Sequence, residues 1–279
     1  MENKAIFFVY KNQDHVFHLE DLTLRALYKP EVERAPYTEE LMRRMETSQL
    51  WNGTYSHDYR WFAHVKGYDI YLVNTETQEE KRLTYGSEEQ MNGRPSWVYP
   101  EEFGQRDAYW FSPDNKKIAY LQYNETDVYQ YPIIQELEFE TGLELERYPK
   151  AGEANPTVNL FILDIETGEV QQVPTNSGPD TYIVRPIWRD NSEELTFRRF
   201  NRKQDYLEFL SYSLDAKEVR TIFTEREDAY INLHDNFYQL NDGEHFLWTS
   251  EQTGFNQLYV YHFDGSLVRQ LTSGENPLG

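Results

Sequence analysis

Apolar and polar residues alternate along most of this chain in short runs, which are separated by polar turns containing glycine, aspartate or asparagine. Four stretches repeat one pattern: a strand, a turn, and a second strand whose last apolar residue is closely followed by threonine. They end at Thr84, Thr175, Thr224 and Thr272, and a weaker copy covers residues 18–27. Alternation with a period of two, broken by turn residues, predicts antiparallel hairpins rather than helices.

A second predicted hairpin, again a strand, a polar turn and a strand, precedes three of the four copies. These hairpins lie at residues 111–120, 188–197 and 240–248. Within the copies, the apolar residues Val173, Ile222 and Leu271 follow one another at intervals of 49 residues. Four antiparallel strands in a unit of that length are typical of a β-propeller blade.

The interval from Leu83 to Val173 is nearly twice as long as this period, so it contains two insertions. One is a loop before Tyr109, and the other covers about residues 129–156. Insertions in a repeat protein project from its loops and often carry function, although they can also be neutral.

Within the second insertion, apolar and acidic residues alternate strictly over residues 136–147. This alternation around Thr141 and Gly142 predicts a projecting β-hairpin arm with one acidic face and one apolar face. The apolar face comprises Leu137, Phe139, Leu143 and Leu145. A lone hairpin is marginal in water, so this face needs a cover, either a second copy of the chain or the blade that bears the arm.

Together these patterns predict an all-β chain that forms an incomplete β-propeller of about five four-stranded blades, with the hairpin arm projecting from it. Residues 1–279 are assigned to this one partial domain. A ring of blades closes when the last blade meets the first, and an open arc leaves strand edges and apolar faces in water. The chain is therefore expected to be a piece of a longer protein.

The formal net charge of −21 disfavours binding to nucleic acids or to anionic membrane surfaces. It favours a cationic ligand, although solubility alone would also account for it. The chain contains no cysteine, which excludes disulfides, thiolate catalysis and cysteine-based metal sites. The first residues do not resemble a signal peptide and no apolar run is long enough to span a membrane, so no compartment is assigned.

The sequence offers no catalytic residues, metal site or cofactor site. It contains no Gly-x-Ser-x-Gly nucleophile elbow, and its seven histidines are scattered. His15 and His18 fall in one predicted strand, where they would face opposite sides and could not share a metal ion.

Several strings resemble the propeller of the dipeptidyl peptidase IV family of serine peptidases, in the prolyl oligopeptidase-like clan. Residues 96–103 read Ser-Trp-Val-Tyr-Pro-Glu-Glu-Phe, and Tyr-Trp-Phe-Ser-Pro follows at 109–113. Residues 148–158 read Tyr-Pro-Lys-Ala-Gly-Glu-Ala-Asn-Pro-Thr-Val. With weaker matches at 123–128 and 248–261, the resemblance covers roughly residues 54 to 275.

The resemblance implies a propeller followed by an α/β-hydrolase domain, which is absent from this sequence, and cleavage after a penultimate proline. It also implies a periplasmic or secreted location and homodimers formed through the arm at 129–156. In the family two glutamates bind the free N-terminus of the peptide substrate, and by motif alignment these are Glu101 and Glu102. An arginine of an early blade holds a substrate carbonyl there, but none of the arginines in residues 1–50 (Arg25, Arg34, Arg43 and Arg44) lies in a matching motif, so none is assigned.

The chemistry of the pair is consistent with that role. An ammonium group has three donors, and ionised carboxylates only accept hydrogen bonds. Neighbouring residues of a strand point to opposite faces, so both glutamates reach one amine only if the segment is not extended. Pro100, which replaces an acidic residue of many relatives, is well placed to begin a short helical turn. A fixed amine would then set how many residues reach the nucleophile.

The leading hypothesis is a substrate-gating propeller of an exopeptidase that releases N-terminal di- or tripeptides after proline, with no catalysis by the chain alone. One alternative is a propeller that serves only as an interaction scaffold. Another is a glycan-active propeller in which Glu101 and Glu102 act as acid and base, although no sugar-binding motif accompanies them.

Overall fold

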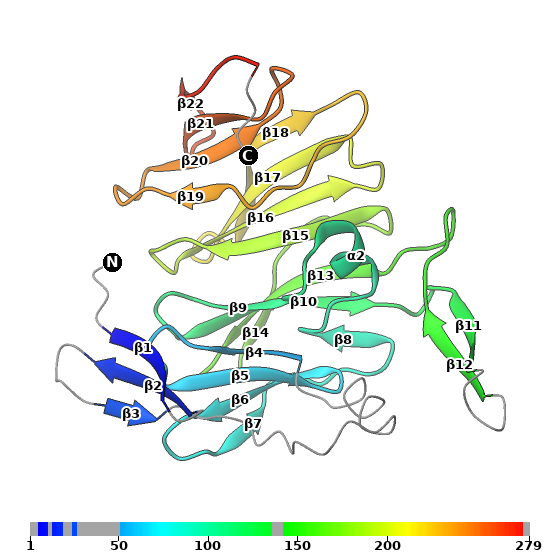
Figure 1. Ribbon diagram of the computed structural model, residues 1–279, viewed down its shortest axis with the longest axis vertical. Helices are drawn as coiled ribbons and strands as arrows, with labels where there is room; N and C mark the ends of the chain where they lie inside the picture. The colour runs from blue at the N-terminus through cyan, green and yellow to red at the C-terminus, as the bar shows by residue number, and fades with distance from the viewer. Residues whose placement is uncertain (1–4, 11–12, 19–23, 27–50, 136–141, 276–279) are drawn as a thin grey trace.

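The chain folds into consecutive antiparallel sheets, which succeed one another along the molecule from the first strands to the last (Figure 1). The computed structural model describes residues 5–10, 13–18, 24–26, 51–135 and 142–275. Within these residues there is one helix, α2 (Val98–Phe103), and all other regular elements are strands.

Five sheets and one separate hairpin make up the described fold. The first sheet contains β1 (Ala5–Tyr10), β2 (Gln13–His18) and β3 (Leu24–Ala26). The second contains β4 (Trp51–Tyr55), β5 (Trp61–Lys66), β6 (Asp69–Asn74) and β7 (Glu80–Arg82). In the third, β8 (Gln90–Asn92) and β9 (Tyr109–Phe111) both pair with β10 (Lys117–Asn124), followed by β13 (Thr157–Asp164) and β14 (Val170–Gln172).

The two remaining sheets have the same simple order. The fourth contains β15 (Thr181–Trp188), β16 (Glu194–Asn201), β17 (Tyr206–Ser213) and β18 (Glu218–Arg226). The fifth contains β19 (Phe237–Gln239), β20 (His245–Ser250), β21 (Gln257–His262) and β22 (Leu267–Gln270). The separate hairpin pairs β11 (Gln130–Gln135) with β12 (Gly142–Arg147).

The hairpins expected from the repeated pattern are confirmed. Phe111 pairs with Ile118, and Trp188 pairs with Leu195, across the turns of the predicted leading hairpins. Leu163 pairs with Val170 in the same way across the turn of a predicted closing hairpin. Two hairpins therefore make up each of the last two sheets, joined by the pairing of their inner strands.

The apolar positions that recur every 49 residues mark where one sheet packs on the next. Val173 is completely buried, and Ile222 is buried in the same aromatic-rich core, which extends through the third, fourth and fifth sheets. The equivalent Leu271, after the outer strand β22 of the fifth sheet, is 45% exposed. Each earlier copy has a following sheet to cover it, which the described residues do not supply for Leu271.

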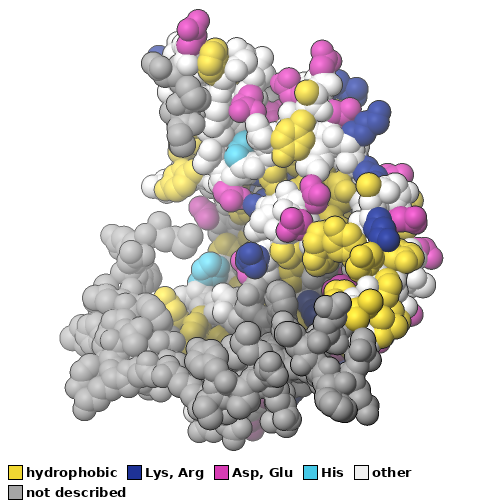
Figure 2. All heavy atoms as spheres, turned by 45° about the vertical axis from the view of Figure 1, so that its right-hand side comes forward, with side chains coloured by type: hydrophobic (Ala, Val, Ile, Leu, Met, Phe, Trp, Pro, Cys, Tyr) yellow, Lys and Arg dark blue, Asp and Glu magenta, His cyan; other side chains and the backbone are white. Residues whose placement is uncertain are grey.

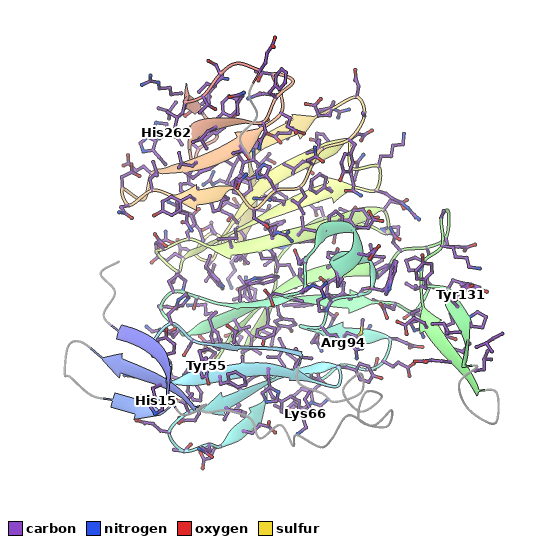
Figure 3. All side chains as sticks on the ribbon, viewed as in Figure 1. His15, Tyr55, Lys66, Arg94, Tyr131 and His262 are labelled. Carbon is purple, nitrogen blue, oxygen red and sulfur yellow. The ribbon has the colours of Figure 1, made fainter. Side chains whose placement is uncertain are left out.

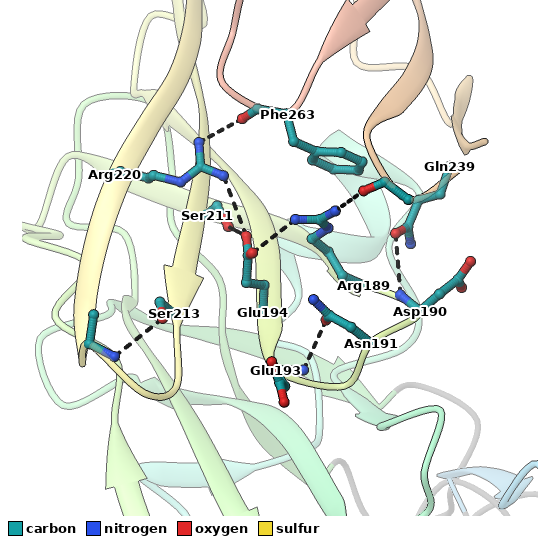
Figure 4. A network of polar contacts seen from close by, with 12 residues as sticks. Arg189, Asp190, Asn191, Glu193, Glu194, Ser211, Ser213, Arg220, Gln239 and Phe263 are labelled. Atoms are coloured by element: carbon teal, nitrogen blue, oxygen red, sulfur yellow. Dashed lines mark hydrogen bonds and ion pairs between the residues drawn. The ribbon is translucent and has the colours of Figure 1, made fainter. Parts of the chain in front are cut away.

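The fourth and fifth sheets are also joined by a polar network around Glu194 (Figure 4). The carboxylate of Glu194 accepts hydrogen bonds from Arg189 Nη1 at 2.8 Å and from Ser211 Oγ at 2.8 Å, and Arg220 lies at 3.4 Å. Arg220 also donates to the carbonyl of Phe263 at 2.6 Å, and the guanidinium of Arg189 lies 3.8 Å from the ring of Phe263. Burial raises the pKa of Glu194, but these hydrogen bonds and positive charges outweigh it and hold the pKa below its usual value.

Replacing Glu194 with alanine should lower the free energy of unfolding by about 2 kcal/mol, because two guanidinium groups at the joint lose their shared acceptor. Urea denaturation of the purified chain measures this change. The adjacent Glu193→Ala is the matched control, since the Glu193 side chain is exposed, and it should change stability little. Equal effects of the two substitutions would contradict a stabilising role for the network.

The register of the separate hairpin differs from the sequence expectation. Gly142 pairs with Gln135 and Leu143 pairs with Ile134, whereas residues 136–141, which include Thr141, lie outside the described residues. The partner strand differs from the expected one because alternation fixes which residues share a face, but not which segment pairs with them. Ile134 pairs with Leu143 and Pro132 pairs with Leu145, so the first strand lies earlier in the chain. The other two residues of the expected apolar face, Leu137 and Phe139, lie outside the described residues.

Candidate functional site

The two glutamates lie next to each other on α2, in the insertion between β8 and β9. The helix has a buried side formed by Val98, Tyr99 and Phe103, whereas Glu101 and Glu102 are exposed. Successive residues of a helix are about 100° apart around its axis, compared with opposite faces in a strand. Both carboxylates are therefore presented on the solvent side of one short element.

Local sequence explains where the helix begins and ends. It begins at Val98, two residues before the expected start at Pro100, which is its third residue. The first N–H groups of a helix have no partner within it, so proline at this position loses no hydrogen bond. Gly104 ends the helix in the left-handed conformation with φ of 60°, and its N–H donates to the carbonyl of Tyr99.

An aromatic core anchors the helix from below. The ring of Tyr99 packs edge-on against Tyr123 at 4.6 Å, and Phe103 packs against Tyr182 at 4.8 Å. The hydroxyl of Tyr99 accepts a hydrogen bond from the N–H of Ile183 in β15 at 3.3 Å, and complete burial raises the pKa of this hydroxyl. The helix is thus attached to both the third and the fourth sheet.

Both ends of the helix have further contacts. Before its first residue, the ring of Trp97 packs edge-on against Tyr148 at 4.3 Å, directly after strand β12 of the separate hairpin. At its last residue, the carbonyl of Phe103 accepts a hydrogen bond from Arg185 Nη2 of β15 at 2.9 Å. Arg185 also forms an ion pair with Asp235, in the segment leading to β19.

The surroundings of Glu102 bring two distant segments together. Tyr182 lies close enough for the Glu102 carboxylate to add to the effect of burial, which raises the pKa of the Tyr182 hydroxyl. That hydroxyl accepts a hydrogen bond from Asn155 Nδ2 at 2.7 Å. Residues 96–103 and 148–158, the two strings that carry the family resemblance, therefore meet at Tyr182.

Glu101 and Glu102 form no hydrogen bond or ion pair with any other residue that the structure describes. Two unpaired carboxylates on an anchored helix can accept hydrogen bonds from a cation with several donors. The described residues contain no cluster of three metal-ligating side chains, and their one helix is not long enough to cross a membrane.

A second polar group, Arg198 and His234, lies next to Asp235. Arg198 of β16 is fully buried, with its guanidinium 4.5 Å from the ring of Trp248, and it donates to the carbonyl of His234. Burial, together with the charge of Arg198, lowers the pKa of His234 to about 4. His234 is therefore neutral near pH 7.

This lowered pKa predicts a pH-dependent stability. Between pH 6.5 and 4 the unfolded chain takes up a proton at His234 that the folded chain does not, so stability falls as the pH falls through this range. His234→Gln should lose less stability between pH 7 and pH 5 than the unmodified chain. Urea denaturation at both pH values measures the difference, and parallel losses would contradict the assignment.

Comparison with known protein families supports the resemblance carried by residues 96–103 and 148–158. Residues 6–278 match the family described as the dipeptidyl peptidase IV (DPP IV) N-terminal region. The chain belongs to this family. The family resemblance inferred from the motifs is confirmed.

Curated DPP IV relatives and solved structures match most of the chain. The dipeptidyl peptidase 4 proteins of Trichophyton tonsurans and Arthroderma otae are each 37% identical over 229 residues, covering 76% of this chain and 29% of theirs. The structure of Porphyromonas gingivalis dipeptidyl peptidase 4 has a TM-score of 0.77 at 23% identity and covers 97% of this chain and 38% of that one. A putative dipeptidyl aminopeptidase IV from Bacteroides ovatus gives a TM-score of 0.77 at 18% identity, covering 98% of this chain and 38% of that one.

The chain thus spans less than a third of the length of these fungal DPP IV relatives, and the bacterial structures share its fold. Sequence reasoning placed Glu101 and Glu102 together but did not single out Arg185, Asp235 or Tyr182. For Arg185 one signal was available, since Pro186 interrupts an otherwise regular strand pattern directly after it.

Proposed function

We propose that this chain is the substrate-gating, N-terminus-binding part of a DPP IV-like serine exopeptidase that releases di- or tripeptides after proline. Glu101 and Glu102 would bind the free ammonium group of the peptide. The observation that carries this proposal is the presentation of two adjacent, unpaired carboxylates on α2, whose other side is buried in the core.

Two carboxylates on an anchored helix would hold the N-terminus of the peptide at a fixed position. An ammonium group donates three hydrogen bonds, and bonds between charged partners are roughly twice as strong as neutral ones. An acetylated or internal segment lacks this charge and would leave the carboxylates desolvated without compensation. The pair would therefore select free N-termini and set the distance from there to the cleaved bond.

The sheets support a propeller as the setting of the site. We propose that the five consecutive sheets are blades of an incomplete β-propeller, since the later ones repeat a four-stranded order and pack through equivalent apolar positions. A further blade would cover Leu271.

Bond cleavage is assigned to sequence outside these residues. The chain contains no Gly-x-Ser-x-Gly motif, and its matched relatives are more than three times as long as the matched part. By this proposal the chain binds peptide ends and, on its own, does not hydrolyse them.

Calorimetry with a dipeptide amide of the X-Pro type tests the binding role. The free amine should bind weakly, and its N-acetylated form should bind at least about tenfold more weakly, because the charged hydrogen bonds are lost. Glu101→Gln and Glu102→Gln should each reduce binding of the free amine.

Glu193→Gln is the matched control for these substitutions, because Glu193 is an exposed glutamate on the turn after β15. It should leave the affinity for the free amine unchanged. Equal binding of the free and acetylated dipeptides would overturn the proposal and favour an interaction scaffold.

We also propose that the hairpin of β11 and β12 joins two copies of the chain. Five of its apolar residues are exposed, and Figure 2 brings this side of the molecule forward and shows hydrophobic side chains gathered on it. They are Tyr131 and Ile133 on one face of the hairpin and Ile134, Leu143 and Leu145 on the other, and this second face is the proposed contact. Figure 3 shows Tyr131 on the hairpin, away from the sheets. A two-stranded sheet with this much exposed apolar surface is stabilised when a second copy covers it.

Sedimentation equilibrium should show a dimer at micromolar concentration. Ile134→Glu together with Leu143→Glu, which change two residues paired across the hairpin, should shift it to monomer. Ile133→Glu is the matched control, since Ile133 pairs with Glu144 and lies on the opposite face. A monomer at high micromolar concentration, unaffected by any of these changes, would contradict self-association.

A further inference from the structure

Arg185 contacts the end of α2 with both its main chain and its side chain. Its N–H donates to Gln105 Oε1 at 2.8 Å, and its Nη1 donates to the same oxygen at 3.3 Å. Its Nη2 donates to the carbonyl of Phe103, the last residue of the helix, at 2.9 Å. A cation at this end also opposes the partial negative charge of the helix carbonyls.

The backbone at Arg185 has an unusual conformation that makes these contacts possible. Its φ is +51°, in the left-handed region that residues with a Cβ rarely adopt. The pairing of β15 with β16 shifts register between Val184 and Ile187, and Pro186 has no N–H to donate. Such irregularities redirect a side chain, and here the main-chain N–H turns to Gln105 instead of the neighbouring strand.

A partner from the next sheet orients the guanidinium group. Its Nε forms an ion pair with Asp235, in the segment that leads from β18 to β19. The hydrogen bond from Arg185, with the charges of Arg185 and Arg198, outweighs burial and lowers the pKa of Asp235, so this carboxylate stays ionised. Arg185 thus connects the fourth sheet, the end of α2 and the entry to the fifth sheet.

We propose that Arg185 is a positioning residue for the glutamate pair: it fixes the C-terminal end of α2 and thereby the placement of Glu101 and Glu102. This inference rests on the proposed binding function. The guanidinium donates to Phe103, Gln105 and Asp235 and does not neutralise the glutamates, which keep their charge for the ligand. Gly104 follows Glu102 by two residues and has no side chain, so the contacts of Arg185 hold the end of the helix from outside.

Hydrogen–deuterium exchange tests the positioning role without a ligand. In Arg185→Ala the amides of residues 98–105, which include the two N–H groups bonded to the carbonyl of Tyr99, should exchange about tenfold faster. Arg185→Lys should restore protection only in part, because lysine lacks the planar fork. Asp235→Asn should raise exchange in the same segment while leaving the backbone contacts of Arg185 in place.

Arg189→Ala is the matched control. Arg189 directly follows the same strand and likewise joins a carboxylate, Glu194, to a backbone carbonyl, that of Gly243, but it does not contact α2. It should leave exchange of residues 98–105 unchanged. Unchanged exchange in Arg185→Ala, or equal acceleration in both variants, would overturn the inference. If Arg185→Ala does not fold, the same criteria apply to Asp235→Asn.

Calorimetry with the X-Pro dipeptide amide then tests whether the contacts of Arg185 with α2 affect binding of the ligand by the glutamate pair. Arg185→Ala should weaken binding of the free amine about tenfold, and the further effect of Glu102→Gln should fall below about threefold in that background. Fully additive effects would overturn the positioning role. If the unmodified chain does not bind the amide, the proposed function fails, and the exchange experiment still decides whether Arg185 fixes the helix.

Discussion

The site depends on the burial of Tyr99 and Phe103 on one side of a six-residue helix. A helix this short has no stability of its own, because its few internal hydrogen bonds do not offset the cost of ordering it. Packing of the Tyr99 ring against Tyr123 and of the Phe103 ring against Tyr182 stabilises the helix. Once these two side chains face inward, the helical period turns Glu101 and Glu102, which lie between them, outward. The same packing that stabilises the element therefore also directs its carboxylates.

Arginine side chains make many of the polar contacts between separate segments of this acidic chain. Several of them link a carboxylate to the backbone carbonyl of a different segment, a task that suits the five donors and fixed geometry of the guanidinium group. They are Arg147, Arg185, Arg189, Arg199, Arg202 and Arg220. With 27 basic and 48 acidic residues, the chain commits many of its cations to these contacts, and carboxylates such as Glu101 and Glu102 stay unpaired.

The sequence predicted the parts of the fold that follow from local patterns. Hairpins such as those at Phe111–Ile118 and Trp188–Leu195 were readable because turn residues interrupt a period of two. The family and the glutamate pair were readable from contiguous strings. The strand that pairs with β12 was not readable, because the alternation around Gly142 is equally compatible with several pairing partners. The contacts of Arg185 were not readable, since they join residues about 50 to 80 positions apart through a backbone irregularity.

The difference between the features that the sequence predicted and those that it did not has a physical cause. Burial and turn formation act on residues that are close in the sequence. The contacts at the two ends of α2 come instead from three separate segments: Tyr148 directly after β12, strand β15, and the segment at Asp235. None of these contacts involves the glutamates themselves. A helix that is held from beneath and at both ends can leave its outward carboxylates without partners, because its stability does not depend on them. Their exposure and their fixed position therefore arise from the same set of contacts.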